Sequence, residues 1–182
     1  MDIAIHPIKH EIYVADTYNN RTMLYPPGVK NGTVLLGNNG YGHNNTQLSF
    51  PQGFYFDIVS NSFFIANTFS HNIVRHMIGE KTWTLVVGTL NGSAGSSSNL
   101  LSVPTEVILD PMGNMYVADQ NNHRIQFYYN AQANGTTIAG ITSLWNMNAT
   151  TLRNPCSLRL DSQLNLYVVD TGNHRIQKFF RY

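Results

Sequence analysis

A short segment that occurs four times at nearly constant spacing limits the folds open to this chain more than any other feature. Each copy places an aromatic residue, a valine or isoleucine, and an alanine or valine before an acidic or amide side chain. These acidic or amide positions are Asp16, Asn67, Asp119 and Asp170, which lie 51, 52 and 51 residues apart. Such a long, regular period is typical of a chain whose units stack and bury their apolar faces against one another.

Within each unit, short alternating runs rich in Val, Ile, Tyr, Phe and Thr indicate strands rather than helices. In the third unit the pattern predicts strands at Glu106–Leu109, Met115–Ala118, His123–Tyr128 and Thr136–Ala139. Four antiparallel strands repeated in this way predict an all-β fold, a β-propeller of four-stranded antiparallel blades, because radial repetition protects the edges of the sheets.

Two of the repeated segments carry a family resemblance. Tyr116–Gln126 and Tyr167–Gln177 resemble the NHL repeat, whose name abbreviates its Asn-His-Leu core. The resemblance covers essentially the whole chain, although the first unit lacks the histidine and the second unit departs most. It implies a propeller that usually has six blades, and therefore more repeats than this chain contains.

Counting strands gives fifteen, which corresponds to about 3.75 blades. The predicted blades are residues 1–50, 51–103, 104–154 and the incomplete 155–182. We therefore expect a fragment of a six-bladed ring, completed by remaining blades in the same longer chain or by a second copy of this one. A compact four-bladed ring is the alternative left open.

Charge is scarce and balanced, which excludes two classes of partner. Only 12% of the residues are charged and the net charge is +1. A nucleic-acid groove or a polybasic membrane patch needs many more basic side chains, so neither partner is expected. No apolar run is long enough for a membrane helix, and the single Cys156 excludes an internal disulfide or a multi-cysteine metal cluster.

Three of the repeats place an aspartate and an arginine five residues apart, and we expect each pair to staple the hairpin of its blade. The pairs are Asp16 with Arg21, Asp119 with Arg124, and Asp170 with Arg175. The second unit has neutral Asn67 and Asn72 instead, which leaves no lone charge behind. A catalytic carboxylate has no reason to recur in every blade, so the recurrence favours a structural role.

Histidines follow three of the acidic or amide positions by four residues, at His71, His123 and His174. On successive blades they would lie too far apart to share one metal ion at about 2 Å, so we assign them to the repeat motif. We expect no catalytic residue, no metal and no cofactor, because the sequence has no phosphate loop, nucleophile elbow or zinc-binding helix motif. Cys156 is interpreted as a small packing residue.

Two alternatives to a simple binding scaffold follow from the family resemblance. The lyase domain of peptide-amidating enzymes has similar blade motifs and binds zinc through histidines near the axis. The first-strand segments Phe54–Asp57, Glu106–Asp110 and Leu158–Asp161 contain no histidine, and only His6 lies where it could face the channel. The alternatives are a fragment of such a metal-dependent peptidyl-amidoglycolate-lyase-like propeller, and the target-recognition propeller of a tripartite-motif-type ubiquitin ligase.

The connections between blades differ far more than the repeated motif does. Asn38–Phe50, Thr89–Val103 and Ile141–Asn154 are expected on the same face as the Asp-to-Arg loops, with a flexible tip at Gly92–Ser98. Because binding residues concentrate on loops held by a rigid scaffold, we expect a protein or glycan ligand there. The candidate contact residues are Tyr41, His43, Leu144, Trp145 and Met147.

Six Asn-x-Ser/Thr sequons occur, against roughly three expected by chance. They are Asn20, Asn31, Asn44, Asn91, Asn134 and Asn148. Their number favours an extracellular or secreted glycoprotein, whereas a ligase-type protein would be cytoplasmic. The sequence therefore predicts a non-catalytic propeller scaffold that binds a protein or glycan through its inter-blade loops.

Overall fold

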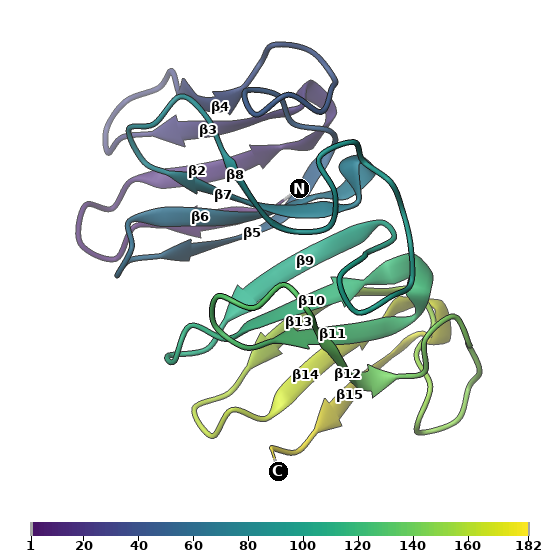
Figure 1. Ribbon diagram of the computed structural model, residues 1–182. Helices are drawn as coiled ribbons and strands as arrows, with labels where there is room; N and C mark the ends of the chain where they lie inside the picture. The colour runs from purple at the N-terminus through teal and green to yellow at the C-terminus, as the bar shows by residue number, and fades with distance from the viewer. Residues whose placement is uncertain (1, 182) are drawn as a thin grey trace.

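Figure 1 shows the computed structural model, which describes residues 2–181 and consists of four antiparallel sheets. Met1 and Tyr182, the outermost residues of the first and fourth predicted blades, lie outside the described residues. Within each sheet the strands pair in chain order, so every strand lies beside its neighbour in sequence. The predicted all-β propeller fold is therefore confirmed.

The described part of the chain contains the fifteen strands that the sequence predicts. The first sheet contains β1 (Ile3–Ile5), β2 (Ile12–Asp16), β3 (Arg21–Tyr25) and β4 (Thr33–Gly37). The second contains β5 (Pro51–Asp57), β6 (Ser62–Asn67), β7 (Asn72–Met77) and β8 (Thr84–Val87). The third contains β9 (Pro104–Leu109), β10 (Met115–Asp119), β11 (Arg124–Tyr128) and β12 (Thr136–Gly140). The fourth has three strands, β13 (Pro155–Leu160), β14 (Leu166–Asp170) and β15 (Arg175–Phe179).

Apolar clusters fill the spaces between successive sheets. The pleat of a strand sends neighbouring side chains to opposite faces, so the two middle sheets are buried on both sides. Val117 of β10 packs in the cluster shared with the second sheet, whereas the adjacent Ala118 packs in the cluster shared with the fourth. This double burial explains why the repeated motif is a continuous apolar run rather than a strict alternation.

The outer faces of the first and fourth sheets are much less covered. Ile125 of β11 is 0% exposed, whereas the equivalent Ile176 of β15 is 70% exposed. On the other side, Val107 of β9 is 0% exposed and the equivalent Ile3 of β1 is 56% exposed. These sheets lie at opposite ends of the arrangement in Figure 1, and no sheet within residues 2–181 covers either face. Residues 2–181 therefore do not close into the compact four-bladed ring.

A short 3₁₀ helix follows the second strand of every sheet, which the sequence analysis did not predict. These helices are η1 (Thr17–Asn19), η2 (Thr68–Ser70), η3 (Gln120–Asn122) and η4 (Thr171–Asn173). Each ends on a residue with left-handed backbone, and His123 has φ of 56° in that position. The predicted third strand is therefore one residue too long, since His123 belongs to the turn.

The inter-blade connections lie on the same face as these 3₁₀ helices. The amides of Phe69, Asn121 and Gly172 each donate to a carbonyl of the preceding connection, at 3.1, 3.1 and 2.8 Å. A glycine stands at or directly after the end of the last strand in each of the three complete sheets. At Gly140 (φ +80°) an added Cβ would collide with the carbonyl oxygen of His123, so a larger residue does not fit. We call the surface formed by the 3₁₀ helices and the three connections the loop face.

Candidate functional site

The aspartate and arginine of each pair meet across the hairpin between the second and third strands. Arg Nε donates to Asp Oδ2 at 2.7 Å from Arg21 to Asp16, at 2.7 Å from Arg124 to Asp119, and at 2.8 Å from Arg175 to Asp170. In the second sheet the two amides replace them, and Asn67 Nδ2 donates to Asn72 Oδ1 at 3.1 Å.

Two of these pairs also hold the connection that precedes their own blade. Asp119 Oδ1 accepts from the amide of Ser102 at 2.7 Å. The remaining guanidinium nitrogens of Arg124 donate to the carbonyls of Ser96, Ser97 and Leu100 at 2.8 to 3.1 Å. Two carbonyls of the tip at Gly92–Ser98, which was predicted to be flexible, are thus bonded to a buried guanidinium. Arg175 holds the carbonyls of the next connection in the same way.

Two of the motif histidines accept a hydrogen bond from the last residue of the connection that follows their own blade. His71 Nδ1 accepts from the amide of Val103 at 3.0 Å, and His123 Nδ1 accepts from the amide of Asn154 at 3.2 Å. In the first sheet, Asn20 Oδ1 accepts from Phe50 in the same way, at 2.8 Å. Burial lowers the pKa of His71 and of His123, with smaller contributions from the neighbouring His43 and Arg153, which favours the neutral ring that accepts at Nδ1.

The predicted contact residues fall into two separate groups on the loop face. Tyr41 and His43 lie together, with ring centroids 6.0 Å apart, and His43 Nδ1 lies 3.0 Å from Ser70 Oγ. Trp145 stacks on the guanidinium of Arg153 at 4.5 Å. The remaining members of that second group are exposed, namely Leu144 and Met147. No interaction between side chains within residues 2–181 joins the two groups.

Sequence analysis missed an aromatic cluster on the loop face, formed by Tyr18, Phe50 and Phe69. Phe50 and Phe69 stack with centroids 4.5 Å apart and 14° between planes, and Tyr18 meets Phe50 edge-on at 5.2 Å. Tyr18 and Phe69 occupy the same position of successive 3₁₀ helices, where the third and fourth units have Asn121 and Gly172. Comparing the units position by position would have revealed this departure.

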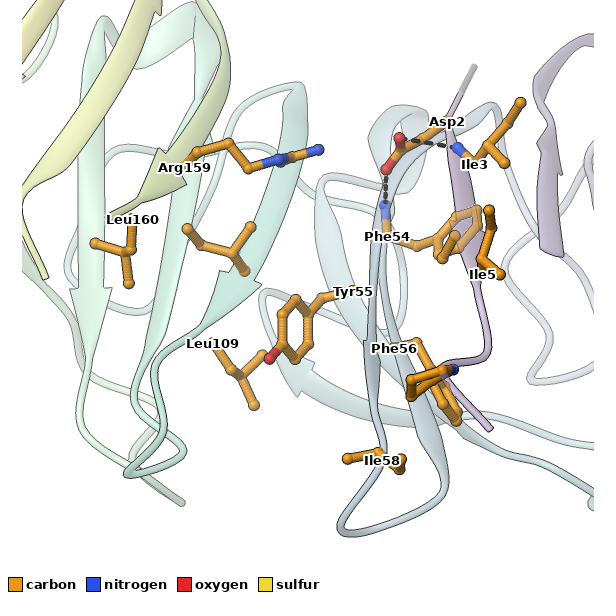
Figure 2. Close-up of a pocket in the computed structure, with 13 residues that line it drawn as sticks. Asp2, Ile3, Ile5, Phe54, Tyr55, Phe56, Ile58, Leu109, Arg159 and Leu160 are labelled. Atoms are coloured by element: carbon orange, nitrogen blue, oxygen red, sulfur yellow. Dashed lines mark hydrogen bonds between the residues drawn. The ribbon is translucent and has the colours of Figure 1, made fainter. Parts of the chain in front are cut away.

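A second candidate site is a cavity of about 520 Å³ between the first strands of the four sheets. Figure 2 shows its lining, with Asp2 and Arg159 near one end, Ile58 and Leu109 toward the other, and Tyr55 midway between the two ends. Asp2 is occupied by backbone donors, since it accepts from the amides of Ile3 and Phe54, the two dashed lines in the figure. We call this space the axial cavity.

Beside the axial cavity, Glu106 of β9 is a buried carboxylate with incomplete hydrogen bonding. Its Oε2 lies 3.3 Å from Arg159 Nη1 and accepts from Ser157 Oγ at 3.2 Å, whereas Oε1 is buried without a partner. Burial, followed by the nearby Asp2 charge, raises the pKa of Glu106 from 4.5 to about 7. The ion pair does not reverse this shift because the Arg159 side chain is 60% exposed to water.

The raised pKa of Glu106 predicts a specific pH dependence of stability. Between pH 4.5 and about 7 the folded protein keeps a proton that the unfolded chain has lost, so this residue's contribution falls as the pH rises. The loss amounts to about 3 kcal/mol across that window. Glu106→Gln keeps the shape without the titration, so its urea unfolding free energy should vary less with pH than that of the unmodified chain. Parallel pH profiles would contradict this prediction.

The remaining sequence candidates are placed as follows. Five sequon asparagines are exposed, and Asn20 is half-buried in the framework. His6 is buried, and its Nδ1 accepts from the amides of Ile8 and Lys9, so it holds a turn. Cys156 is a half-buried free thiol. Within residues 2–181 no three histidine, cysteine or acidic side chains gather as metal ligands, and no helix has the length and apolar character to cross a bilayer.

The solved structures similar to this chain include both binding proteins and enzymes. An auxiliary nutrient binding protein from Bacteroides thetaiotaomicron is 20% identical with a TM-score of 0.75, over 97% of this chain and 46% of its own. A gluconolactonase from Xanthomonas campestris is 16% identical with a TM-score of 0.74, over 99% and 57%. Virginiamycin B lyase from Staphylococcus aureus is 13% identical with a TM-score of 0.59, over 99% and 55%.

The chain thus spans about half the length of the structures it resembles, and at these identities the likeness shows the fold alone. No curated protein sequence matches it. The family model described as the NHL repeat matches residues 152–179, which confirms the predicted resemblance in the fourth unit. The fourth unit therefore carries an NHL repeat, and the chain as a whole has a β-propeller fold.

Proposed function

We propose that this segment is a non-catalytic scaffold that binds a protein or glycan ligand through its inter-blade connections. The observation that carries the proposal is that repeated and variable residues of the loop face have different roles. Its repeated polar residues are engaged in holding the connections, while variable side chains such as Tyr41 and Trp145 remain exposed. Similar structures named auxiliary nutrient binding proteins support a binding role.

We also propose that further blades cover the two open faces, so that the units at 1–50, 51–103, 104–154 and 155–182 form part of a longer ring. The contrast between Ile125 and Ile176 supports this proposal, because one repeat position is buried in one sheet and exposed in the next. The additional blades would come from the same longer chain or from a second copy. Five exposed sequons favour an extracellular location.

Alanine variants of Tyr41 and Trp145 test the proposed binding face. Both side chains are exposed, so their removal should leave the fold intact, and each should weaken capture of ligands on protein and glycan arrays. Met112→Ala serves as the control, because Met112 is similarly exposed in a turn on the opposite face. Ligand capture that neither loop-face variant reduces would contradict the assignment of this face.

An enzymatic function would use the axial cavity rather than the loop face. Gluconolactonases and a lyase share the fold, and the axial cavity with its buried Glu106 is where such chemistry would be sought. Turnover of a ligand that is lost in Glu106→Gln would favour an enzyme over the proposed scaffold.

A further inference from the structure

The aromatic cluster of Tyr18, Phe50 and Phe69 presents apolar ring surface to solvent at the loop face. Tyr18 is 86% exposed and Phe69 is 45% exposed, although both rings contact Phe50. Exposed aromatic rings on a single face of a protein commonly mark a binding surface. Since the third and fourth units have no aromatic residue at the matching positions, the repeat framework does not require these rings.

The framework holds the cluster in place before any ligand arrives. The amide of Phe50 donates to Asn20 Oδ1 at 2.8 Å, and the amide of Phe69 donates to the carbonyl of Ser49 at 3.1 Å. These bonds fix the backbone on either side of the stacked pair. A rigid aromatic surface loses little conformational freedom on binding, which favours affinity.

Polar groups border the cluster on one side. Ser70 directly follows Phe69, and its hydroxyl lies 3.0 Å from His43 Nδ1. The ring of His43 in turn lies 6.0 Å from that of Tyr41. A hydroxyl-rich ligand resting on the aromatic rings would therefore find a phenol and an imidazole at its edge, both able to exchange hydrogen bonds with it.

The ligand that fits this face carries no net charge. The three inter-blade connections and the four 3₁₀ helices contain a single charged side chain, Arg153, whose guanidinium stacks on Trp145. The turns on the opposite face carry Lys9, Glu11, Lys30, Glu80, Lys81, Asp110 and Asp161. An anionic ligand, or a partner selected by charge complementarity, would need charged side chains that these loops lack apart from Arg153.

From this combination we propose that the aromatic cluster is a stacking site for a pyranose ring of a neutral oligosaccharide. A pyranose has one face of C–H groups with positive character, which suits the negative face of an aromatic ring, and a rim of hydroxyls. The inference rests on the proposed function, since it names the ligand class and the residues that bind it.

The test uses the chain produced in a bacterial host without N-glycosylation, so that sequon glycans do not occupy the face. The probes are an array of neutral gluco-, galacto-, manno- and xylo-hexasaccharides, their uronic-acid counterparts, and a peptide array. We expect a neutral hexasaccharide to bind, and its affinity by calorimetry to fall about tenfold in Tyr18→Ala and in Phe69→Leu. Phe69→Leu keeps apolar volume without the ring, so it separates stacking from packing.

Tyr129→Ala is the matched control, because Tyr129 is 67% exposed and has an edge-on aromatic neighbour, but follows β11 on the opposite face. Equal loss of affinity in this variant, or binding of uronic-acid saccharides alone, would overturn the proposal. Peptide binding that depends on Tyr41 or Trp145, without saccharide binding, would overturn the saccharide site and keep the proposed function. If neither the saccharide array nor the peptide array shows binding, the saccharide site and the proposed function are both overturned.

Discussion

Replacing Asp119 by alanine should lower the free energy of unfolding by about 3 to 5 kcal/mol. The side chains of Asp119 and Arg124 are 0% and 3% exposed, so the variant would leave a guanidinium buried without its carboxylate. It would also remove the acceptor for the amide of Ser102. Urea denaturation at pH 7 would measure the loss directly. A loss below about 1 kcal/mol, as for an exposed ion pair, would contradict the structural role of the pair.

The second blade supplies a natural comparison for the double variant Asp119→Asn with Arg124→Asn. Asn67 and Asn72 bond to each other there without any charge. The double variant should therefore be less destabilised than the sum of its single variants. Some loss should remain, because three carbonyls of the preceding connection lose the Arg124 donors. The half-exposed pair of Asp16 and Arg21 is the control, and Asp16→Ala should cost under about 1 kcal/mol.

Ile125→Ala should lower the free energy of unfolding by about 2 to 5 kcal/mol, whereas Ile176→Ala at the equivalent repeat position should change it by less than about 0.5 kcal/mol. Ile125 is fully buried against the fourth sheet, and truncating it leaves a cavity. Ile176 is largely exposed because no sheet within residues 2–181 covers it.

This matched pair also tests the open face of the fourth sheet. The two isoleucines share the same strand position, so intrinsic strand preference cancels between them. If a second copy closes the ring in solution, Ile176→Ala should destabilise strongly, and the effect should depend on protein concentration. A large effect that is independent of concentration would contradict the exposure of Ile176 in the monomer.

The fold was predictable because the same pattern of strands and turns occurs in four successive units. Short apolar runs between turn residues locate every strand, and in the third unit the predicted ends differ from the observed ones by one or two residues. The start of β11 was placed one residue too early, at His123. The left-handed backbone of that residue is not visible in a pattern of apolar and polar residues, because it belongs to a 3₁₀ turn that the amide of His123 closes on the carbonyl of Gln120. Its side chain also accepts a hydrogen bond from the amide of Asn154, which is distant in sequence.

The candidate sites were predictable only in part. Exposure of Tyr41 and Trp145 follows from their place in variable connections, but stacking of Phe50 on Phe69 depends on how a connection docks against the next blade. Likewise, Glu106 is one acidic residue in a predicted strand. Its buried, unpartnered oxygen arises only when β9 and β13 pack side by side.

The most direct measurement of the binding face is amide hydrogen exchange with and without the tightest-binding hexasaccharide or peptide from the arrays. We expect protection to rise at residues 18–20, 41–50 and 69–71, with no change along the first strands that line the axial cavity. The contrary result would be protection at Tyr55 and Arg159, with the ligand chemically altered during the exchange. That outcome would place function in the axial cavity and contradict a scaffold that binds through its loop face.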